Sequence, residues 1–244
     1  MTPRLGELWV YLSASPLLGL TVTLAAYQGG YWLYRRSGMN PLANPVLIAV
    51  AILVSLLLIT GTSYQTYFNG AQFVHFLLGP ATVALAVPLY AHIKRIRAML
   101  VPVVTGLLAG SLTAVLSAIA IAKLFGATTP TVLSLAPKSV TTPIAMGVAE
   151  QIGGIPSLTA VLVIATGILG AVGGSYIFNA MKLHSPAIRG FAIGVASHGI
   201  GTARAFQESE QAGAFAALAM GMNGLLTALL LPALLPWLGT WLGG

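Results

Sequence analysis

Long apolar runs, separated by short basic or polar connectors, constrain the fold of this chain more than any other feature. They occupy residues 7–34, 45–61, 72–93, 98–122, 157–181, 186–197 and 212–238. The 244 residues include only 11 Lys and Arg and 4 acidic residues, and 57% are hydrophobic. Apolar stretches of about 20 residues are typical of helices that cross a bilayer, where backbone hydrogen bonds must be made within the protein. The sequence therefore predicts an all-α polytopic membrane protein embedded in a lipid bilayer.

The basic residues indicate membrane topology rather than a nucleic-acid partner. The net charge is +7, yet Lys and Arg lie between the apolar runs instead of forming one basic face. If residues 129–152 enter the membrane and return, one side, predicted to be cytoplasmic, holds Arg35, Arg36, Lys94, Arg95, Arg97, Lys182 and Arg189. Only Arg4 and Lys123 then lie outside. The count predicts a multi-pass protein with a cytoplasmic C-terminus, residues 183–189 inside and residues 208–211 outside.

The residue types that usually carry catalysis are scarce. The chain has no Cys and no Asp. Its acidic residues are Glu7, Glu150, Glu208 and Glu210. No H-E-x-x-H or G-x-S-x-G motif is present, and the adjacent Ser197 and His198 would point in different directions on a helix. The sequence thus predicts no enzyme, no cofactor and no metal site. Net positive charge at membrane depth favours an anionic solute.

One polar stretch interrupts the apolar pattern: Pro137-Lys138-Ser139-Val140-Thr141-Thr142-Pro143. A lysine at bilayer depth costs about 2.5 to 3.5 kcal/mol, so it normally faces protein, water or a ligand. Thr142 followed by Pro143 has the N-cap and first-turn chemistry that begins a helix, whose free N–H groups would point back towards Lys138. We therefore predict a broken, re-entrant helix over residues 129–152 with an electropositive tip. The alternative is a loop outside the membrane, where a lysine costs little.

The spacing of the runs also predicts an internal repeat. Residues 1–36 would form an N-terminal transmembrane helix, and residues 44–240 a domain with two units of three spans each. The first unit, residues 44–123, is interrupted at Gly79-Pro80-Ala81-Thr82, and the second, residues 157–240, at Gly199-Ile200-Gly201-Thr202. Three spans are an odd number and the re-entrant segment adds none, so the units would be inverted, as in many transporters. The prediction is about seven spans.

A candidate anion site follows from the charged residues expected at membrane depth. Arg204 would lie in the first turn of a helix that begins near Thr202, where the helix dipole opposes a cation. An anion between Lys138, Arg204 and the helix starts at Thr142 and Thr202 would satisfy all four groups. The alternative pairs Arg204 with Glu208, one turn later on the same helix.

Other polar and small residues extend this candidate site. They are Ser139, Thr141, His198, Gly199 and Gly201, with Glu150 as a candidate for proton coupling. His198 would supply a hydrogen bond or a proton, since histidine titrates near physiological pH. The alternatives are a buried His198 bonded to a neighbouring helix and a Glu150 that simply reaches solvent. Asn223 is expected to join helices.

Three segments resemble the LrgB/CidB family. They are Pro137 to Ala145 (PKSVTTPIA), Ile152 to Gly154 (IGG) and Ala196 to Ala205 (ASHGIGTARA), and the resemblance runs from about residue 40 to the C-terminus. It implies a protein of the bacterial cell (inner) membrane, described as holin-like or antiholin-like and affecting murein hydrolase activity and autolysis. It also implies a small LrgA/CidA-type membrane partner. Plastid relatives exchange glycolate and glycerate, and bacterial members are linked to pyruvate.

Two functions stay open on the sequence. As a carrier, the protein would bind a small monocarboxylate at Lys138 and Arg204 and expose it alternately to the two sides of the membrane. As a holin-like or antiholin-like regulator, it would assemble with the partner and modulate murein hydrolase export. We expect a homo-oligomer. The carrier interpretation accounts for positive charge at helix N-termini, which a scaffold does not require.

Overall fold

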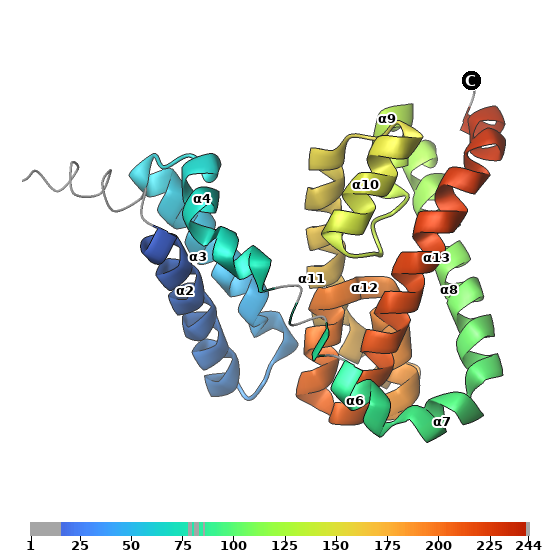
Figure 1. Ribbon diagram of the computed structural model, residues 1–244, viewed down its shortest axis with the longest axis horizontal. Coiled ribbons are helices and arrows are strands. Elements are labelled where there is room, and N and C mark those ends of the chain that lie inside the picture. Colours follow the sequence, from blue (N-terminus) through green and yellow to red (C-terminus); the bar gives the residue numbers. More distant parts are fainter. Residues whose placement is uncertain (1–15, 78–79, 81–82, 85, 243–244) are drawn as a thin grey trace, which may run out of the picture. The chain divides into compact units, whose positions relative to one another are not determined.

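The computed structural model describes residues 16–77, 80, 83–84 and 86–242, and every regular element within them is a helix (Figure 1). The all-α prediction is therefore confirmed. The chain forms two compact units, Met1–Ala84 and Leu85–Gly244. This boundary falls inside the segment expected to form the first repeat. Most of the interruption predicted at Gly79–Thr82 lies outside the described residues.

The first unit is built from helices with clear start and stop signals. Its described elements are α2 (Pro16–Arg36), the 3-10 helix η1 (Pro41–Ala43), α3 (Pro45–Thr60) and α4 (Tyr64–Phe76). The side-chain oxygen of Asn44 accepts the N–H groups of Val46 and Leu47 at 2.9 and 3.1 Å, which fixes the start of α3. Gly61 ends that helix with a φ of 64°. The helix predicted at residues 45–61 is confirmed.

The polar residues after α3 form most of α4. The Ser63 hydroxyl accepts the N–H of Thr66 at 3.1 Å, and this cap begins α4. Tyr67 on α4 shares a 2.7 Å hydrogen bond with Thr23 of α2, which ties the two helices together.

The second unit contains the longest apolar helices. Its described helices are α6 (Ala86–Ala91), α7 (Ile93–Ala98), α8 (Leu100–Leu124), α9 (Thr129–Leu135), α10 (Thr142–Ile152), α11 (Pro156–Ala180), α12 (Pro186–Glu208) and α13 (Glu210–Leu242). Among the described residues, α8, α11 and the Glu210–Leu234 part of α13 are long and apolar enough to cross a membrane. A membrane protein is thus supported, whereas seven spans and an inverted repeat are not confirmed.

Residues 129–152 break and return within the second unit. The connection at residues 136–141 separates α9 from α10, and the end of α10 comes back to α9. The N–H of Ile155, just after α10, donates to Ser134 Oγ of α9 at 2.7 Å. A Cβ added at Gly154 would lie only 2.9 Å from the Ser134 nitrogen. The predicted broken helix is therefore confirmed, and we call residues 129–152 the first hairpin.

Residues 186–208 of α12 also fold back on themselves. Ser197 and His198 leave the helical conformation, with φ values of −131° and 41°. Arg189 Nε lies 3.4 Å from Glu208 Oε2, although 19 residues of straight helix would separate them by about 28 Å. We call residues 186–208 the second hairpin.

The second hairpin has two legs packed closely together. The first leg is residues 186–196 and the second is residues 199–208. A Cβ at Gly201 of the second leg would lie 2.9 Å from the carbonyl oxygen of Ile193 in the first. The prediction that this segment crosses the membrane once is therefore wrong, and so is the expectation that residues 183–189 and 208–211 lie on opposite sides.

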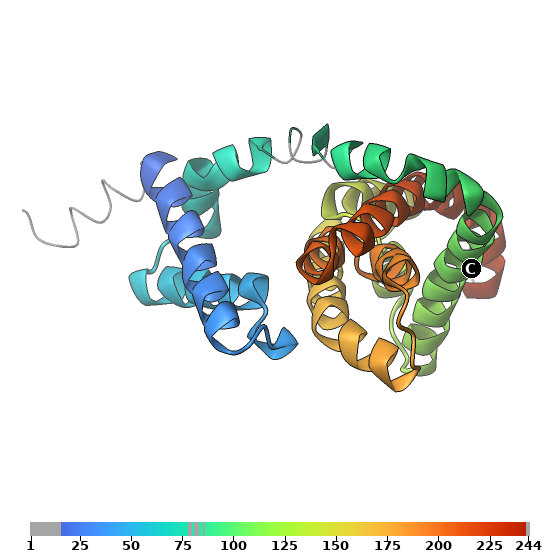
Figure 2. The same cartoon turned by 90° about the horizontal axis from the view of Figure 1, so that it is seen from below.

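The two hairpins approach each other from opposite ends of the second unit (Figure 1). The first hairpin lies where α8 finishes and α11 starts, and the second lies where α11 finishes and α13 starts. α12 contacts α8, α11 and α13, which run along the outside of the hairpins in the view of Figure 2. The connection of each hairpin, its tip, therefore points into the interior of the unit.

Candidate functional site

The two tips meet at one side chain of α13. Asn223 is 1% exposed, and its amide nitrogen Nδ2 donates to the carbonyl oxygens of Ser139 at 3.4 Å and Val195 at 3.0 Å. Ser139 belongs to the first tip, and Val195 is two residues before the break of the second hairpin. One amide group therefore fastens both hairpins to α13, and the role expected for Asn223 in joining helices is confirmed.

Lys138 lies in the first tip, as the sequence predicted. Its side chain is half-buried, and Nζ donates to the Ser139 hydroxyl at 3.2 Å. Ser139 thus touches both the lysine, through its hydroxyl, and Asn223, through its carbonyl. The lysine is not on an exposed loop, because the flanking Pro137 and Ser139 are buried. The structure therefore favours the broken-helix interpretation over the surface-loop alternative.

The start of α10 supplies the partial positive charge expected at the first tip. The N-cap residue is Thr141, one position before the predicted Thr142, and its carbonyl oxygen accepts the N–H of Ala145 at 2.9 Å. The Thr141 side chain makes no capping hydrogen bond. The first N–H groups of a helix have no partner within it, so the unblocked start of α10 can receive an anion.

The second tip is seated in a notch of α11. His198 Nε2 lies 3.0 Å from the carbonyl oxygen of Val163, so the imidazole is bonded to a neighbouring helix. This is the structural alternative considered for His198, and it is the one observed. A Cβ at Gly167 would lie 2.7 Å from the His198 ring, and one at Gly170 would collide with the Ser197 hydroxyl. The two glycines therefore create the space that this tip occupies.

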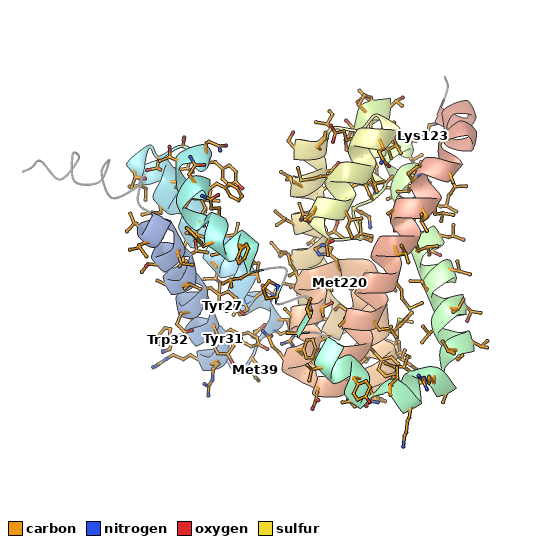
Figure 3. The ribbon with its side chains drawn as sticks, viewed as in Figure 1. Tyr27, Tyr31, Trp32, Met39, Lys123 and Met220 are labelled. Carbon is orange, nitrogen blue, oxygen red and sulfur yellow. The ribbon has the colours of Figure 1, made fainter. Side chains whose placement is uncertain are left out.

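The second leg begins at Gly199, three residues before the predicted start at Thr202. The break occurs at Ser197 and His198 rather than within the glycine-containing segment. Thr202 is inside the leg, where its hydroxyl donates to the His198 carbonyl oxygen at 2.7 Å and lies 3.7 Å from Met220 Sδ (Figure 3). Gly201 allows the legs to pack, whereas Gly199 has only Met220 near its missing Cβ. Neither Thr202 nor Gly201 caps a helix.

Arg204 lies in the second turn of its leg rather than in the first. Its guanidinium is 3.3 Å from Gln207 Oε1 and 3.8 Å from Glu208 Oε1, so the ion pair considered as the alternative is present. Glu208 also accepts a 2.6 Å hydrogen bond from Ser175 of α11 and pairs with Arg189 of the first leg. Arg204 therefore belongs to a polar cluster that joins both legs to α11 near their outer ends.

Glu150 is exposed near the end of α10, about 12 Å along the helix from its start. Its suggested part in proton coupling stays a prediction. In the part of the chain that the structure describes, no group of three or more His, Cys, Asp or Glu could hold a metal ion.

An apolar cavity lies beside the second hairpin. It has a volume of about 380 Å³ and lies between α8 and the first leg, with Gly106, Phe191, Val195 and Phe215 among its lining residues. At Gly106 the two helices still touch, since a Cβ there would lie 3.3 Å from the Phe191 ring. The cavity extends to Ala196, just before the second tip, but offers little polar surface, so it is unsuited to an anion.

The groups near the two tips carry net positive charge. The start of α10 lies a few residues after Ser139 and the start of the second leg a few residues after Val195, the two residues bonded to Asn223, and each start contributes roughly half a positive charge. Lys138 adds a full charge, and His198 is near enough to interact with it electrostatically. Asn223 and Val163 complete the site. In the sequence, Asn223 stands out as a polar amide within an apolar run. Nothing in the sequence indicates Val163 as part of the site, because it contributes only a backbone oxygen.

The fold and the hairpins define a helical membrane protein with two broken segments that meet inside it. The comparison of sequences then identifies the family: a model of the LrgB-like family matches residues 23–237, and the chain belongs to it. The resemblance of the three motifs is thereby confirmed.

Named relatives cover almost the whole chain. The YwbG protein of Bacillus subtilis is 36% identical over 216 residues, which is 88% of this chain and 96% of the relative. The holin-like protein CidB of Staphylococcus epidermidis is 31% identical over 91% of this chain and 96% of its own. The antiholin-like protein LrgB of Bacillus cereus is 29% identical over 89% and 95% respectively. No solved structure matches the chain.

Proposed function

We propose that this protein carries small monocarboxylates, of the glycolate, glycerate or pyruvate class, across the bacterial cell (inner) membrane. The observation that supports it most is the meeting of two hairpin tips at Asn223, next to the half-buried Lys138 and the start of α10, which has no side-chain cap. A carboxylate there would interact with the lysine as a point charge and with backbone N–H groups as hydrogen-bond donors. No catalytic step is proposed, and no cofactor.

The energetics favour a bound anion at this position. A lysine at membrane depth costs about 2.5 to 3.5 kcal/mol, and a hydrogen bond to a charged group stabilises by about 1.5 to 3 kcal/mol. An anion therefore offsets much of the cost of burying Lys138. Arg204 is excluded from the proposed first contacts, because Glu208 already pairs with it. Its proposed role is to hold the second hairpin closed.

The hairpins provide a route for alternating access. Each enters from its own end of the unit, so displacement of one tip would open the site towards one end while the other stays closed. The end that holds the second hairpin and α7 carries Lys94 and Arg97 on α7, Lys182 in the connection after α11, and Arg189 on the first leg, and we propose that it is cytoplasmic. Because α13 runs away from that end, this assignment places the C-terminus outside, opposite to the expectation from seven spans.

The partners expected from the sequence remain part of the proposal. They are a small LrgA/CidA-type membrane protein and further copies of the same chain. The second candidate function is regulation of murein hydrolase export, and it is favoured by the names of two relatives, holin-like CidB and antiholin-like LrgB. In that case the tips would shape the subunit of an oligomer rather than bind a solute.

Uptake by proteoliposomes tests the carrier function. Labelled glycolate, glycerate and pyruvate are supplied to liposomes with the purified protein, with and without an LrgA-type partner. We expect saturable uptake that is lost in Lys138→Ala. Lys123→Ala should keep it, because Lys123 lies in the last turn of α8 and not at either tip (Figure 3). Release of a large entrapped dye without saturable uptake would instead support a holin-like lesion.

A further inference from the structure

The apolar cavity beside the second hairpin runs from one end of the second unit towards its middle. On α8 it is lined from Pro102 to Ala114, and on the first leg from Ala187 to Ala196. The lined part of α8 rises by about 18 Å, and half of the hydrocarbon core of a bilayer is roughly 15 Å thick. The cavity is therefore about as long as one leaflet of a membrane is deep.

The cavity opens at the surface of the unit. Pro102 and Gly106 of α8 and Ile188 of the first leg line it and are nevertheless exposed. Every lining residue is either apolar or glycine, so ordered water would find no side-chain partners there. Because α8 is long and apolar enough to cross a membrane, lipid hydrocarbon would surround this opening.

The cavity is too narrow to contain a helix. Its volume of about 380 Å³, spread over about 18 Å, gives a mean cross-section of about 20 Å². A helix with its side chains is about 10 Å wide, so its cross-section is about 80 Å². A helix of a partner could cover the opening but not enter it, whereas the acyl chain of a lipid is slim enough to enter.

Two cations lie at the outer end of the cavity. The short helix α7 lies across this end of the unit (Figure 1), and its Ile96 packs in one cluster with Val103 of α8 and Ala187 of the first leg. Lys94 and Arg97 of α7 are exposed, and neither forms an ion pair with a residue that the structure describes. Their charges are therefore available to a ligand at this end.

Two helix starts add partial positive charge at the same end. The N-cap residues are Met99 for α8 and Ser185 for α12, and neither helix has a side-chain cap. Met99 and Ala187 both line the cavity, so both starts lie beside it. Phosphate groups commonly bind at helix starts. Glu208 and Glu210 are also at this end, but Glu208 is already paired with two arginines.

We propose that this cavity binds an anionic phospholipid, with one acyl chain between α8 and the first leg and the phosphate beside Lys94 and Arg97. The chain supplies the van der Waals contacts that the walls of a cavity otherwise lack. The phosphate accepts charge-assisted hydrogen bonds from the two cations. This site is separate from the two tips, and it requires no solute, so it goes beyond the carrier function.

Lipid binding to the unaltered full-length protein tests the inference. Native mass spectrometry in detergent compares dioleoylphosphatidylglycerol, which is anionic, with dioleoylphosphatidylcholine, which has the same chains and no net charge. The anionic lipid should bind roughly tenfold to thirtyfold more tightly, the ratio expected for two cations near a membrane surface. Glycerol phosphate has the phosphate without the chains and should bind far more weakly. Equal binding of the two lipids, or equal binding of glycerol phosphate and the anionic lipid, overturns the inference.

Variants separate the two ends of the bound lipid. The double variant Lys94→Ala, Arg97→Ala should bind the anionic lipid no better than the neutral one, whereas Lys123→Ala, in the last turn of α8, should keep the preference. Ala192→Leu narrows the cavity from the first leg and should weaken both lipids by a similar factor. Ala109→Leu is the matched control, since Ala109 is exposed on α8 and does not line the cavity.

The cavity variants also distinguish a lipid from a second copy of the chain. If Ala192→Leu does not fold, Ala114→Leu narrows the cavity from α8 in its place, and if neither folds, the three ligands on the unaltered protein decide. A folded cavity variant that binds both lipids as tightly as the unaltered protein overturns the inference. A changed oligomeric state with unchanged lipid binding shows that another copy covers this face, which overturns it as well.

Discussion

A single methyl group added at Gly170 tests whether the second tip is seated in α11. An alanine Cβ there would collide with the Ser197 hydroxyl and lie 2.7 Å from the Ser197 Cβ. Overpacking a tight contact costs about 1 to 3 kcal/mol, while alanine in place of a helical glycine gains roughly 0.5 to 1 kcal/mol. Gly170→Ala should therefore lower the free energy of unfolding by about 1 kcal/mol and push the tip away from α11.

Gly173 provides the control on the same helix. A Cβ at Gly173 meets no atom within 4 Å, so Gly173→Ala should show only the gain in helix propensity. The difference in stability between the two variants isolates the steric cost, about 1 to 3 kcal/mol. Thermal unfolding of the purified proteins in detergent measures it, and calorimetry with glycolate should show weaker binding for Gly170→Ala alone.

A second substitution sharpens the test. Ser197→Gly removes both atoms that the new methyl group would meet, so the Gly170→Ala and Ser197→Gly double variant should regain most of the lost stability. Such non-additivity is expected only for residues in direct contact. If Gly170→Ala is as stable as Gly173→Ala, or if the double variant is strictly additive, the second tip does not lie in the α11 notch.

Three further predictions concern charge and topology. Lys138→Ala should lower carboxylate affinity roughly tenfold to a hundredfold in calorimetry, with the protein still inserted normally; unchanged affinity would exclude the proposed contact. Glu208→Gln should destabilise the protein by about 1 to 2 kcal/mol in thermal unfolding, because two guanidinium groups lose a carboxylate, whereas Glu210→Gln should have little effect. Single cysteines at Ser185 and Ser209 should react alike with an impermeant thiol reagent in intact cells, and labelling of one alone would contradict the second hairpin.

The first hairpin could be predicted because its signals are local. Pro137 removes a helical hydrogen bond, Thr142 followed by Pro143 favours the start of a new helix, and Lys138 is costly in any lipid-facing position. The observed N-cap of α10 is Thr141, whereas the sequence predicted Thr142. A difference of one residue is typical of helix ends.

The second hairpin could not be predicted from local signals. Its break uses His198 at a φ of 41°, a conformation that non-glycine residues rarely adopt, although glycines lie directly after it. The hydrogen bond to Val163 and the notch at Gly167 stabilise that conformation, and both come from α11. The predicted position of Arg204, in the first turn of its helix, is wrong for the same reason. Its distance from the helix start depends on where the break falls, and the break lies at Ser197 and His198.

The packing of the second hairpin indicates where it can move. Its first leg is tight against α13, since a Cβ at Gly190 or Gly194 would collide with backbone atoms of that helix. The same leg faces the apolar cavity of about 380 Å³ on its α8 side. A packed interface resists sliding, whereas a cavity leaves room for side chains to rearrange. Any opening of this hairpin is therefore expected as a movement of α12 and α13 together relative to α8. A reducible bifunctional thiol reagent that cross-links Gly106→Cys to Phe191→Cys should then block uptake and reduction should restore it, whereas full uptake by the cross-linked protein would show that the movement occurs elsewhere.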